Sequence, residues 1–337
     1  MKSTALIILM IVFSELNAQD PSLVIPVGHT TSVLSADISP DGQKYLNTSY
    51  DGTAKIWNNS GFELYAVHGF DRYANQASFN KTGEYFLVRY EKTVAVYRVE
   101  TGELVSEFTK SSGIESARFT KNGDKIFFTT YFTAGVFEAV TGDQVYETDL
   151  EIEKIVAADL SRDESTIAVV QESVGITVVE IIPDGKNEKF SIPGLEFTSI
   201  NFSPDGESIA AGANDGHIRV WNLEKNELII DRPGHSNPII SVQYNNTGTK
   251  LVSAGEDEVI IFWDAPSGDT LYVIRDTDNQ KGAFFNPGSD KVLSYASWGL
   301  QVWDANTGSL LYELDIDRHT GSRNDVDFTN VQHAAFS

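Results

Sequence analysis

Three residues near the start of the chain have the side chains of a nucleophilic catalytic triad. His29, Ser49 and Asp51 provide an imidazole, a hydroxyl and a carboxylate, the groups with which many hydrolases activate a serine. A His and an Asp in similar surroundings occur again at His235 and Asp257. A single active site needs these groups once. Their recurrence therefore favours a structural role within a repeated element.

A repeat of about 41 residues carries these groups. Trp221, Trp263 and Trp303 follow one another at intervals of 42 and 40 residues, and Trp57 precedes Trp221 by 164 residues, which is four such repeats. The intermediate steps fall on the large apolar residues Tyr97, Phe137 and Val179. Turn sequences keep the same phase at 39–42, 80–83, 120–123, 161–164, 203–206, 245–248 and 286–289. Seven copies are therefore visible.

Each copy has the pattern of four short β-strands. Val, Ile, Tyr, Phe and Thr alternate with polar residues between turn residues, and no helical stripe is present. In the first copy the strands are expected at 33–39, 44–49, 53–57 and 63–67. One such sheet cannot bury both of its faces, so the copies must pack against one another. We predict an all-β fold, a β-propeller of seven complete four-stranded blades. An open β-solenoid is the alternative, but solenoid repeats are normally shorter.

The copies resemble the WD-repeat family, over about residues 22–316, and are similar to its secreted bacterial members. The resemblance implies that a Gly-His pair, a Ser or Thr, an Asp and a Trp form a structural hydrogen-bonded tetrad in each blade. Copy 1 matches at Gly28, His29, Ser49, Asp51 and Trp57, and partial tetrads are expected at His235, Asp257 and Trp263, at Asp215 and Trp221, and at Trp303. Gly255 stands where the Ser of the sixth copy is expected, and Leu195 replaces the His of the fifth.

The N-terminal residues 1–18 have the pattern of a secretory signal peptide. Lys2 precedes the apolar run 5–13, and a more polar stretch ends at the small residue Ala18. A membrane anchor is the alternative, but the run is about half of the roughly 20 residues that a spanning helix needs. We expect cleavage near Ala18, no membrane insertion afterwards, and a propeller domain over 19–337 located outside the cytoplasm, in the periplasm or secreted.

Composition excludes several classes of function. The 337 residues are 41% hydrophobic with 11% aromatic residues, which is too apolar for a disordered chain. The absence of cysteine excludes disulfides, thiolate metal sites and a cysteine nucleophile. A net charge of -23 argues against nucleic acid as a partner, because Lys and Arg carry phosphate binding. The remaining histidines show no shared spacing, and we expect neither a metal nor a cofactor.

Function in such a fold is expected on the loops of one face. The residue before the turn Asp, or its equivalent, is aromatic in four copies: Tyr50, Tyr90, Tyr131 and Trp298. Exposed Tyr and Trp side chains bind proteins well, because they bury a large area at low entropic cost. We therefore predict a non-catalytic scaffold that binds a protein or peptide partner. A glycan-binding module stays open, as does a propeller enzyme of the lactonase or glycosidase type, although no in-phase set of carboxylates or histidines supports the latter.

The two ends of the chain hold strand patterns that do not belong to the seven copies. Residues 22–27 read as a lone outer strand, and 329–337 repeat the pattern of the first strand of a copy. A propeller of this family closes by pairing strands from its two ends. We therefore expect that the chain is the N-terminal part of a longer protein with a further blade. A natural seven-bladed ring with extra end segments is the alternative.

Overall fold

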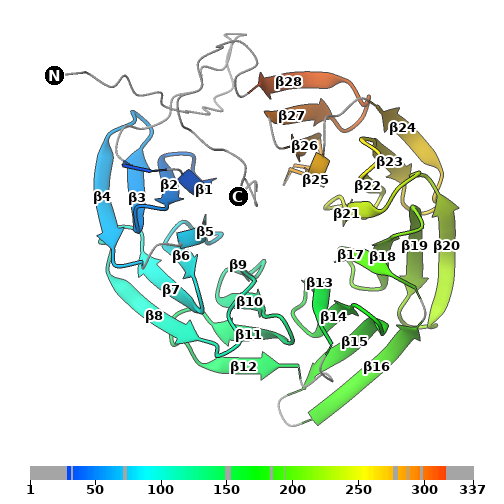
Figure 1. The fold of residues 1–337 in the computed structure, drawn as a ribbon, viewed down its shortest axis with the longest axis horizontal. Coiled ribbons are helices and arrows are strands. Elements are labelled where there is room, and N and C mark those ends of the chain that lie inside the picture. The colour runs from blue at the N-terminus through cyan, green and yellow to red at the C-terminus, as the bar shows by residue number, and fades with distance from the viewer. Residues whose placement is uncertain are drawn as a thin grey trace. The chain divides into compact units, whose positions relative to one another are not determined.

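A computed structural model describes residues 29–31, 33–70, 74–148, 153–182, 185–193, 195–275, 280–286, 288–296 and 299–315. Within these residues the regular structure consists of β-strands, which form seven four-stranded antiparallel sheets (Figure 1). The strands of each sheet follow one another in chain order. The predicted fold, a seven-bladed β-propeller, is confirmed. The predicted signal peptide, both end strands and Trp298 lie outside the described residues.

The sheets are numbered as blades 1 to 7. Blade 1 holds β1 (Val33–Ile38), β2 (Lys44–Ser49), β3 (Thr53–Asn58) and β4 (Glu63–His68), and blade 2 holds β5 (Ala74–Phe79), β6 (Tyr85–Tyr90), β7 (Thr93–Arg98) and β8 (Leu104–Thr109). Blade 3 holds β9 (Ser116–Phe119), β10 (Lys125–Thr129), β11 (Ala134–Glu138) and β12 (Gln144–Glu147), and blade 4 holds β13 (Ile155–Leu160), β14 (Thr166–Gln171), β15 (Gly175–Ile182) and β16 (Gly185–Pro193).

The last three blades have the same order of strands. Blade 5 holds β17 (Phe197–Phe202), β18 (Ser208–Ala213), β19 (His217–Asn222) and β20 (Glu227–Pro233). Blade 6 holds β21 (Ile239–Tyr244), β22 (Lys250–Gly255), β23 (Ile260–Asp264) and β24 (Thr270–Ile274). Blade 7 holds β25 (Gln280–Phe285), β26 (Lys291–Ala296), β27 (Gly299–Asp304) and β28 (Leu310–Asp315).

The turn between the first two strands of blade 1 shows why the repeated turn sequence is needed. The backbone amide of Gly42 donates to the carbonyl of Ser39, and the Ser39 hydroxyl donates to the Asp41 carboxylate. Gly42 has a φ of 69°, in the left-handed region that glycine adopts without a steric penalty. The same geometry returns in blade 5, where Ser203 donates to Asp205 and Gly206 has a φ of 75°.

Two β-bulges recur in the blades. The first strand is irregular at its second residue in six sheets, for example between Val33 and Ser35. The last strand is irregular opposite the Trp-like position, for example between Ile56 and Trp57. A bulge bends its strand and increases the local twist. The common positions of these bulges therefore give the blades a common shape.

The chain divides into two compact units, each with its own hydrophobic packing. Among the described residues the first unit holds 29–128 and 137–143, and the second holds 129–136 and 144–315, each with the gaps given above. In the first unit one cluster joins Ile56 of blade 1 to Phe86 and Val88 of blade 2. In the second unit a cluster joins Ile218 of blade 5 to Trp263 of blade 6. Apolar contact between successive blades therefore builds the core of each unit.

Side chains of one blade also satisfy backbone amides on the first strand of the next blade. Asp37 accepts from the amide of Phe79 at 2.7 Å, and Asn201 accepts from the amide of Tyr244 at 2.8 Å. Further pairs, again about one repeat apart, are Asp159 with Phe202, Gln243 with Phe285, Ser35 with Ala77, Gln76 with Ala117, and Ser241 with Ala283. The first strand lies at the edge of its sheet, where amides have no ladder partner. These side chains supply one.

The pKa of Asp37, one of these side chains, is strongly shifted. Burial raises its pKa to about 7, although the amides of Phe79 and Ile38 oppose that shift by donating to the carboxylate. Asn201 accepts the equivalent bond with a neutral amide oxygen. An uncharged acceptor is therefore sufficient at this position in the fold.

We predict that Asp37→Asn keeps the bond to Phe79 and reduces the pH dependence of stability. The unfolded carboxyl titrates near pH 3.9, whereas the folded one titrates near 7. The folded state therefore binds more protons between these values, and the contribution of Asp37 to stability falls as the pH rises from about 4 to 7. Urea unfolding across this range should show a smaller decrease for the variant than for the wild type.

Asp41→Asn is the matched control. Hydrogen bonds from Ser39 and the amide of Gln43 lower the pKa of Asp41. Its contribution to stability is therefore present above the unfolded pKa and lost as the pH falls, which is the opposite sign. An Asp37→Asn protein with the wild-type pH slope between 4 and 7 would show that the folded carboxyl is ionised throughout.

Candidate functional site

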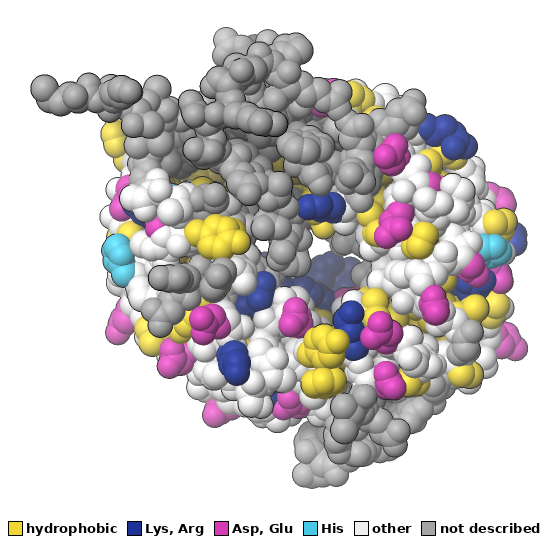
Figure 2. Space-filling view, viewed as in Figure 1, with side chains coloured by type: hydrophobic (Ala, Val, Ile, Leu, Met, Phe, Trp, Pro, Cys, Tyr) yellow, Lys and Arg dark blue, Asp and Glu magenta, His cyan; other side chains and the backbone are white. Residues whose placement is uncertain are grey.

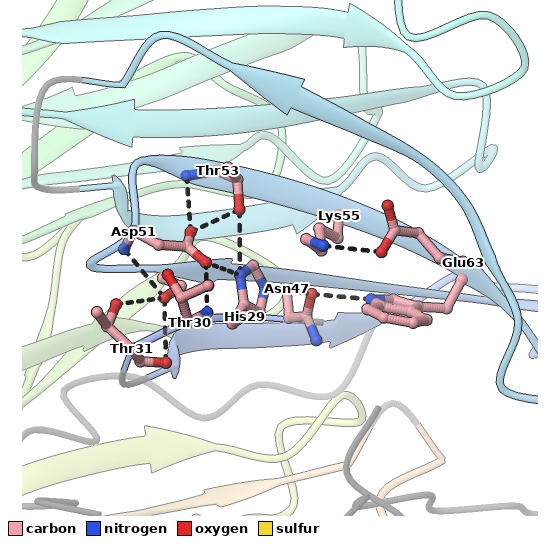
Figure 3. A network of polar contacts seen from close by, with 10 residues as sticks. His29, Thr30, Thr31, Asn47, Asp51, Thr53, Lys55 and Glu63 are labelled. Atoms are coloured by element: carbon pink, nitrogen blue, oxygen red, sulfur yellow. Dashed lines mark hydrogen bonds and ion pairs between the residues drawn. The ribbon is translucent and has the colours of Figure 1, made fainter. Parts of the chain in front are cut away.

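The predicted tetrad of blade 1 is a hydrogen-bonded network in the structure (Figure 3). His29 Nδ1 lies 2.9 Å from Asp51 Oδ2, and His29 Nε2 lies 2.9 Å from Asn47 Oδ1. The indole Nε1 of Trp57 donates to the same Asn47 oxygen at 2.9 Å. Asp51 also accepts from the backbone amides of Thr30 and Thr53 and from the Thr53 hydroxyl. The network ties the start of the blade to its second and third strands.

The prediction for Ser49 was wrong in one respect, because Asn47 is the residue that links His29 to Trp57. Tyr45 is the direct cross-strand partner of Trp57, and Asn47 follows two residues along β2 on the same face. This diagonal position is within reach of a large side chain on the neighbouring strand. The Ser49 hydroxyl instead lies 3.0 Å from the Thr31 hydroxyl.

Blade 6 has the same network with serine in the linking position. His235 Nδ1 lies 2.8 Å from Asp257, His235 Nε2 lies 2.8 Å from the Ser253 hydroxyl, and Trp263 Nε1 donates to that hydroxyl at 2.9 Å. Ser253 was missed because the tetrad was aligned on Gly255. A Cβ at Gly255 would lie 2.4 Å from His235 Nδ1, so glycine leaves the space that the His–Asp pair occupies. The signal in the sequence was a polar residue ten positions before the tryptophan.

The partial tetrads of blades 5 and 7 use other partners. Leu195 replaces the histidine of blade 5, and Asp215 instead binds the Arg219 guanidinium through two contacts of 3.0 and 2.6 Å. Trp221 of that blade packs edge-on against Phe197, with ring centroids 5.4 Å apart. In blade 7 the Trp303 indole donates to the Ser294 hydroxyl at 2.9 Å.

The carboxylates of these networks are held in their ionised form. Burial raises the pKa of Asp51, but hydrogen bonds from Thr53, the Thr30 amide and His29 outweigh it and lower the pKa overall. Burial likewise opposes a lowered pKa of Asp257, and hydrogen bonds, first among them that from His235, outweigh it. Hydrogen bonds from Arg219 lower the pKa of Asp215. Burial lowers the pKa of His235, against the opposing effect of Asp257.

In blade 1 the geometry does not form the catalytic triad that His29, Ser49 and Asp51 suggested. A serine nucleophile must donate to the histidine that acts as its base. In blade 1 the two ring nitrogens of His29 face Asp51 and Asn47, while Ser49 bonds to Thr31. In blade 6 Ser253, His235 and Asp257 are linked in that order, but Ser253 is fully buried, which leaves its hydroxyl without access to a substrate. Within the part of the chain that the structure describes, no three His, Asp or Glu side chains are grouped as metal ligands. In the same part no helix is long and apolar enough to cross a membrane.

The aromatic residues predicted on one ring of loops differ in their surroundings. The side chain of Tyr131 is 42% exposed and that of Tyr50 is 37% exposed. Tyr90 is half-buried and packs on Phe70 with ring centroids 5.1 Å apart, so it contributes to the core of the first unit. Trp298 lies outside the described residues. Tyr50 and Tyr131 therefore meet the requirement of exposure, and Tyr90 does not.

Tyr131 belongs to an exposed group of side chains in the second unit. Phe132 is 37% exposed and stands edge-on to Tyr131, with ring centroids 4.8 Å apart. The amide of Ile155 donates to the Tyr131 carbonyl at 2.9 Å, which brings β13 beside the turn, and Val156 on that strand is 41% exposed. Lys154 Nζ lies 5.8 Å from the centre of the Tyr131 ring. We call Tyr131, Phe132, Lys154 and Val156 the Tyr131 patch.

The turn that presents this patch is held by its own hydrogen bonds. The Thr130 hydroxyl accepts from the amides of Phe132 and Thr133 at 3.2 and 2.9 Å, and the Thr130 amide donates to the Thr133 carbonyl. Tyr131 is the one residue of the patch that the sequence pattern predicted. Val156 is the bulged residue of β13, whose orientation cannot be read from period-two alternation. Phe132 adjoins Tyr131 in the sequence, and its position in a turn was the available signal.

Exposed large apolar side chains occur at several other places among the described residues, for example at Phe62, Leu104 and Ile229. Figure 2 shows hydrophobic side chains in separate groups among acidic and basic ones on one face of the molecule. The acidic side chains on this face are dispersed rather than gathered in one patch (Figure 2). The Tyr131 patch is one of these exposed groups, and it combines an aromatic pair with a lysine.

Comparison with known proteins places the repeats in a family. The fold defines a seven-bladed β-propeller, and the model of the WD40 family, described as WD domain, G-beta repeat, matches residues 21–58, 193–222 and 226–264. Three stretches of the chain thus match the WD40 repeat, and the chain is similar to WD40-repeat propellers. Proteins of this kind are generally non-catalytic, commonly bind protein partners and typically act as scaffolds for protein interactions.

Several curated proteins are similar to parts of the chain. The COMPASS component SWD3 of Saccharomyces cerevisiae is 29% identical over 39% of this chain and 42% of its own length. Apoptotic protease-activating factor 1 of Mus musculus is 28% identical over 39% of this chain and 10% of its own length. Autophagy-related protein 16 of Arabidopsis thaliana is 24% identical over 70% of this chain and 40% of its own length. The chain thus spans less than half the length of these relatives.

A solved structure with a similar fold is the crystal structure of the computationally designed Ika8 protein. The TM-score is 0.73 at 22% sequence identity, and the match covers 87% of this chain and 90% of that one. At this identity the likeness concerns the fold alone.

We predict that Trp57→Ala destabilises the protein by about 3–5 kcal/mol, the usual cost of removing a fully buried large aromatic side chain. Trp57 is 2% exposed and anchors Asn47 through its indole N–H. Chemical denaturation monitored by circular dichroism measures the change. Glu63→Ala is the control in the same blade, because it removes a surface ion pair with Lys55 and should cost no more than about 1 kcal/mol. Equal effects of the two variants would contradict a structural role for the tryptophan network.

Proposed function

We propose that this chain is an extracytoplasmic, non-catalytic WD40 scaffold that binds a protein or peptide partner at the Tyr131 patch. The observation that carries the proposal is the exposed edge-on pair of Tyr131 and Phe132 on a hydrogen-bonded turn. Two large aromatic side chains already held in position lose little entropy when a partner covers them. Such residues are enriched among those that dominate protein binding.

The composition of the patch favours a partner with an apolar side chain next to an acidic group. Phe132 and Val156 offer apolar area, while Lys154 places a positive charge beside Tyr131. The protein as a whole carries a net charge of -23, which repels an acidic partner at long range. Lys154 supplies a positive charge next to the aromatic pair, while Glu147 accepts from the Thr133 hydroxyl at the same turn.

A glycan is the second candidate, and the geometry of the patch disfavours it. Sugar rings stack on open, flat aromatic faces. Phe132 stands at 78° to the Tyr131 ring, and the Lys154 ammonium lies over the Tyr131 ring. The two aromatic rings therefore do not form one flat platform.

We predict that a double variant, Tyr131→Ser with Phe132→Ser, weakens peptide binding at least about tenfold, as expected for loss of a dominant contact. Peptides selected on the immobilised wild-type chain from a display library serve as probes, and affinity is measured by fluorescence polarisation. Lys154→Ala should weaken the acidic peptides and leave neutral ones nearly unchanged.

The control replaces apolar residues of similar exposure at another place in the second unit. Leu228 and Ile229 on β20 are 47% and 52% exposed, and changing both to serine should leave affinity unchanged. Equal loss in the two double variants, or no loss in either, would refute binding at the Tyr131 patch. Binding of the wild type to a glycan array, abolished by the Tyr131 and Phe132 changes, would establish the second candidate instead.

The extracytoplasmic location is proposed on the N-terminal pattern alone. Expressed with its first 18 residues in a bacterial host, the chain should appear outside the cytoplasm with Gln19 as its first residue. Mass spectrometry of the intact protein determines that terminus. Replacing Ile8 by Arg in the apolar run should keep the uncleaved chain in the cytoplasm. An uncleaved wild-type chain held in the membrane fraction would instead identify the segment as an anchor.

A further inference from the structure

The network of blade 1 differs from that of blade 6 in the hydrogen-bonding capacity of one atom. The Trp57 indole is a donor only, so the Asn47 atom 2.9 Å from it must be the carbonyl oxygen Oδ1 rather than the amide nitrogen. This contact fixes the orientation of the Asn47 amide group. The same oxygen lies 2.9 Å from His29 Nε2. An amide oxygen cannot donate, so His29 Nε2 must carry a proton for this contact to be a hydrogen bond.

The other ring nitrogen of His29 faces a carboxylate. His29 Nδ1 lies 2.9 Å from Asp51 Oδ2. Burial opposes ionisation of Asp51, but hydrogen bonds from Thr53 and Thr30 help to outweigh it and lower its pKa, so this carboxyl is ionised and accepts. The Thr53 hydroxyl is 3.1 Å from Nδ1, but its proton is directed to Asp51 Oδ1 at 2.6 Å. Nδ1 must therefore donate as well.

We propose that His29 is held as an imidazolium, with a proton on each ring nitrogen, because Asn47 and Asp51 both present acceptors to it. The positive charge is balanced by Asp51. Together these groups form a network in which the link between the chain at His29 and Asn47 on β2 depends on the second proton, and we call this link the latch.

Blade 6 provides the internal comparison. The Ser253 hydroxyl accepts from the Trp263 indole at 2.9 Å and still has a proton of its own. It donates that proton to His235 Nε2 at 2.8 Å, and His235 needs a proton on Nδ1 alone, for Asp257. A neutral ring completes this network, in agreement with the lowered pKa that burial gives His235. The residue in the linking position, Asn47 in blade 1 and Ser253 in blade 6, thus determines whether the histidine is charged or neutral.

The cationic side chains Lys44, Lys55 and Arg89, on blade 1 and on β6, have partners of their own. Lys55 Nζ lies 2.8 Å from Glu63, and Lys44 Nζ lies 3.0 Å from Glu100. Arg89 donates to the Ile114 carbonyl. The remaining titratable residues on the strands of blade 1 and on β6 are Asp37 on β1, Tyr45 on β2, Tyr65 and His68 on β4, and Tyr85 and Tyr90 on β6. Among the described residues Asp51 is the charged group in contact with His29.

Loss of the second proton acts on the link from His29 to β2. An unprotonated Nε2 would point its lone pair at Asn47 Oδ1, so the contact becomes repulsive and the link from His29 to Trp57 is broken. Asp51, which follows Tyr50 directly, then faces an uncharged ring. The latch is closed when His29 is charged and opens when the ring loses a proton.

The direct test is the protonation of each ring nitrogen in the folded chain, measured by two-dimensional nitrogen–proton NMR at about pH 7.5. An unperturbed histidine, with a pKa of about 6.5, is roughly nine-tenths neutral at that pH. We expect two protonated nitrogens for His29 and one for His235. His29→Gln and His235→Gln variants assign the signals. A bare ring nitrogen on His29 in the folded wild type would overturn the proposal.

Reciprocal substitutions test the role of the linking residue. Asn47→Ser should convert His29 to the single-proton pattern, and Ser253→Asn should add a second proton to His235. Thermal unfolding confirms that each variant is folded, and the Asn47→Ser variant decides the matter if the larger Asn is not accommodated in blade 6. A folded Asn47→Ser protein in which His29 keeps both protons at the same pH would show that Asn47 does not impose the charge.

A second readout follows the indole N–H groups. The Trp57 indole donates to Asn47 Oδ1. The hydrogen-exchange protection of this N–H should fall once His29 has lost its second proton. The Trp263 indole, which donates to Ser253 in blade 6, should keep its protection under the same conditions. Parallel changes at the two indoles would overturn the latch.

Discussion

The first strand of each blade exposes backbone amides at a sheet edge, and the rest of the structure depends on how those amides are satisfied. A four-stranded sheet has two such edges and two faces to bury, so a single blade is not stable alone. Here the preceding blade supplies acceptors about one repeat away, from Asp37 to Phe79 in the first unit and from Gln243 to Phe285 in the second. Apolar contact between successive blades accompanies these bonds. Local stability therefore comes from neighbours in the sequence of repeats, as expected for repeat proteins.

Within a blade, the tetrad positions fasten the entering chain to the second and third strands. The chemistry of these positions is more variable than their geometry. Blade 1 uses Asn47 where blade 6 uses Ser253, and blade 5 replaces the histidine link with an Asp215–Arg219 pair. Each solution satisfies buried polar atoms, which is the condition that the fold imposes. The choice of side chain then sets the local charge, and the protonation of His29 follows from that choice.

The side chains near the turns between the second and third strands have different roles in different blades. Tyr90 packs in the core beside Phe70, whereas Tyr131 is exposed next to Phe132. The Tyr131 patch combines rigid aromatic area with a lysine on an otherwise acidic molecule. Thr130 holds the turn through hydrogen bonds to its amides, which favours the binding role that we propose for this small surface.

Periodicity alone was sufficient to predict the seven blades, the strands of blade 1 to within a residue or two, and the tryptophan column. Each of these is a local pattern that recurs from copy to copy, so it can be distinguished from a single match that arises by chance. The side-chain contacts needed the tertiary structure. Asn47 was missed because cross-strand diagonals depend on register, and Val156 was missed because a bulge reverses the alternation. The exposure of Tyr131 and the burial of Tyr90 were also undecided, because two residues at equivalent positions of a repeat have the same local sequence signal but meet different neighbours.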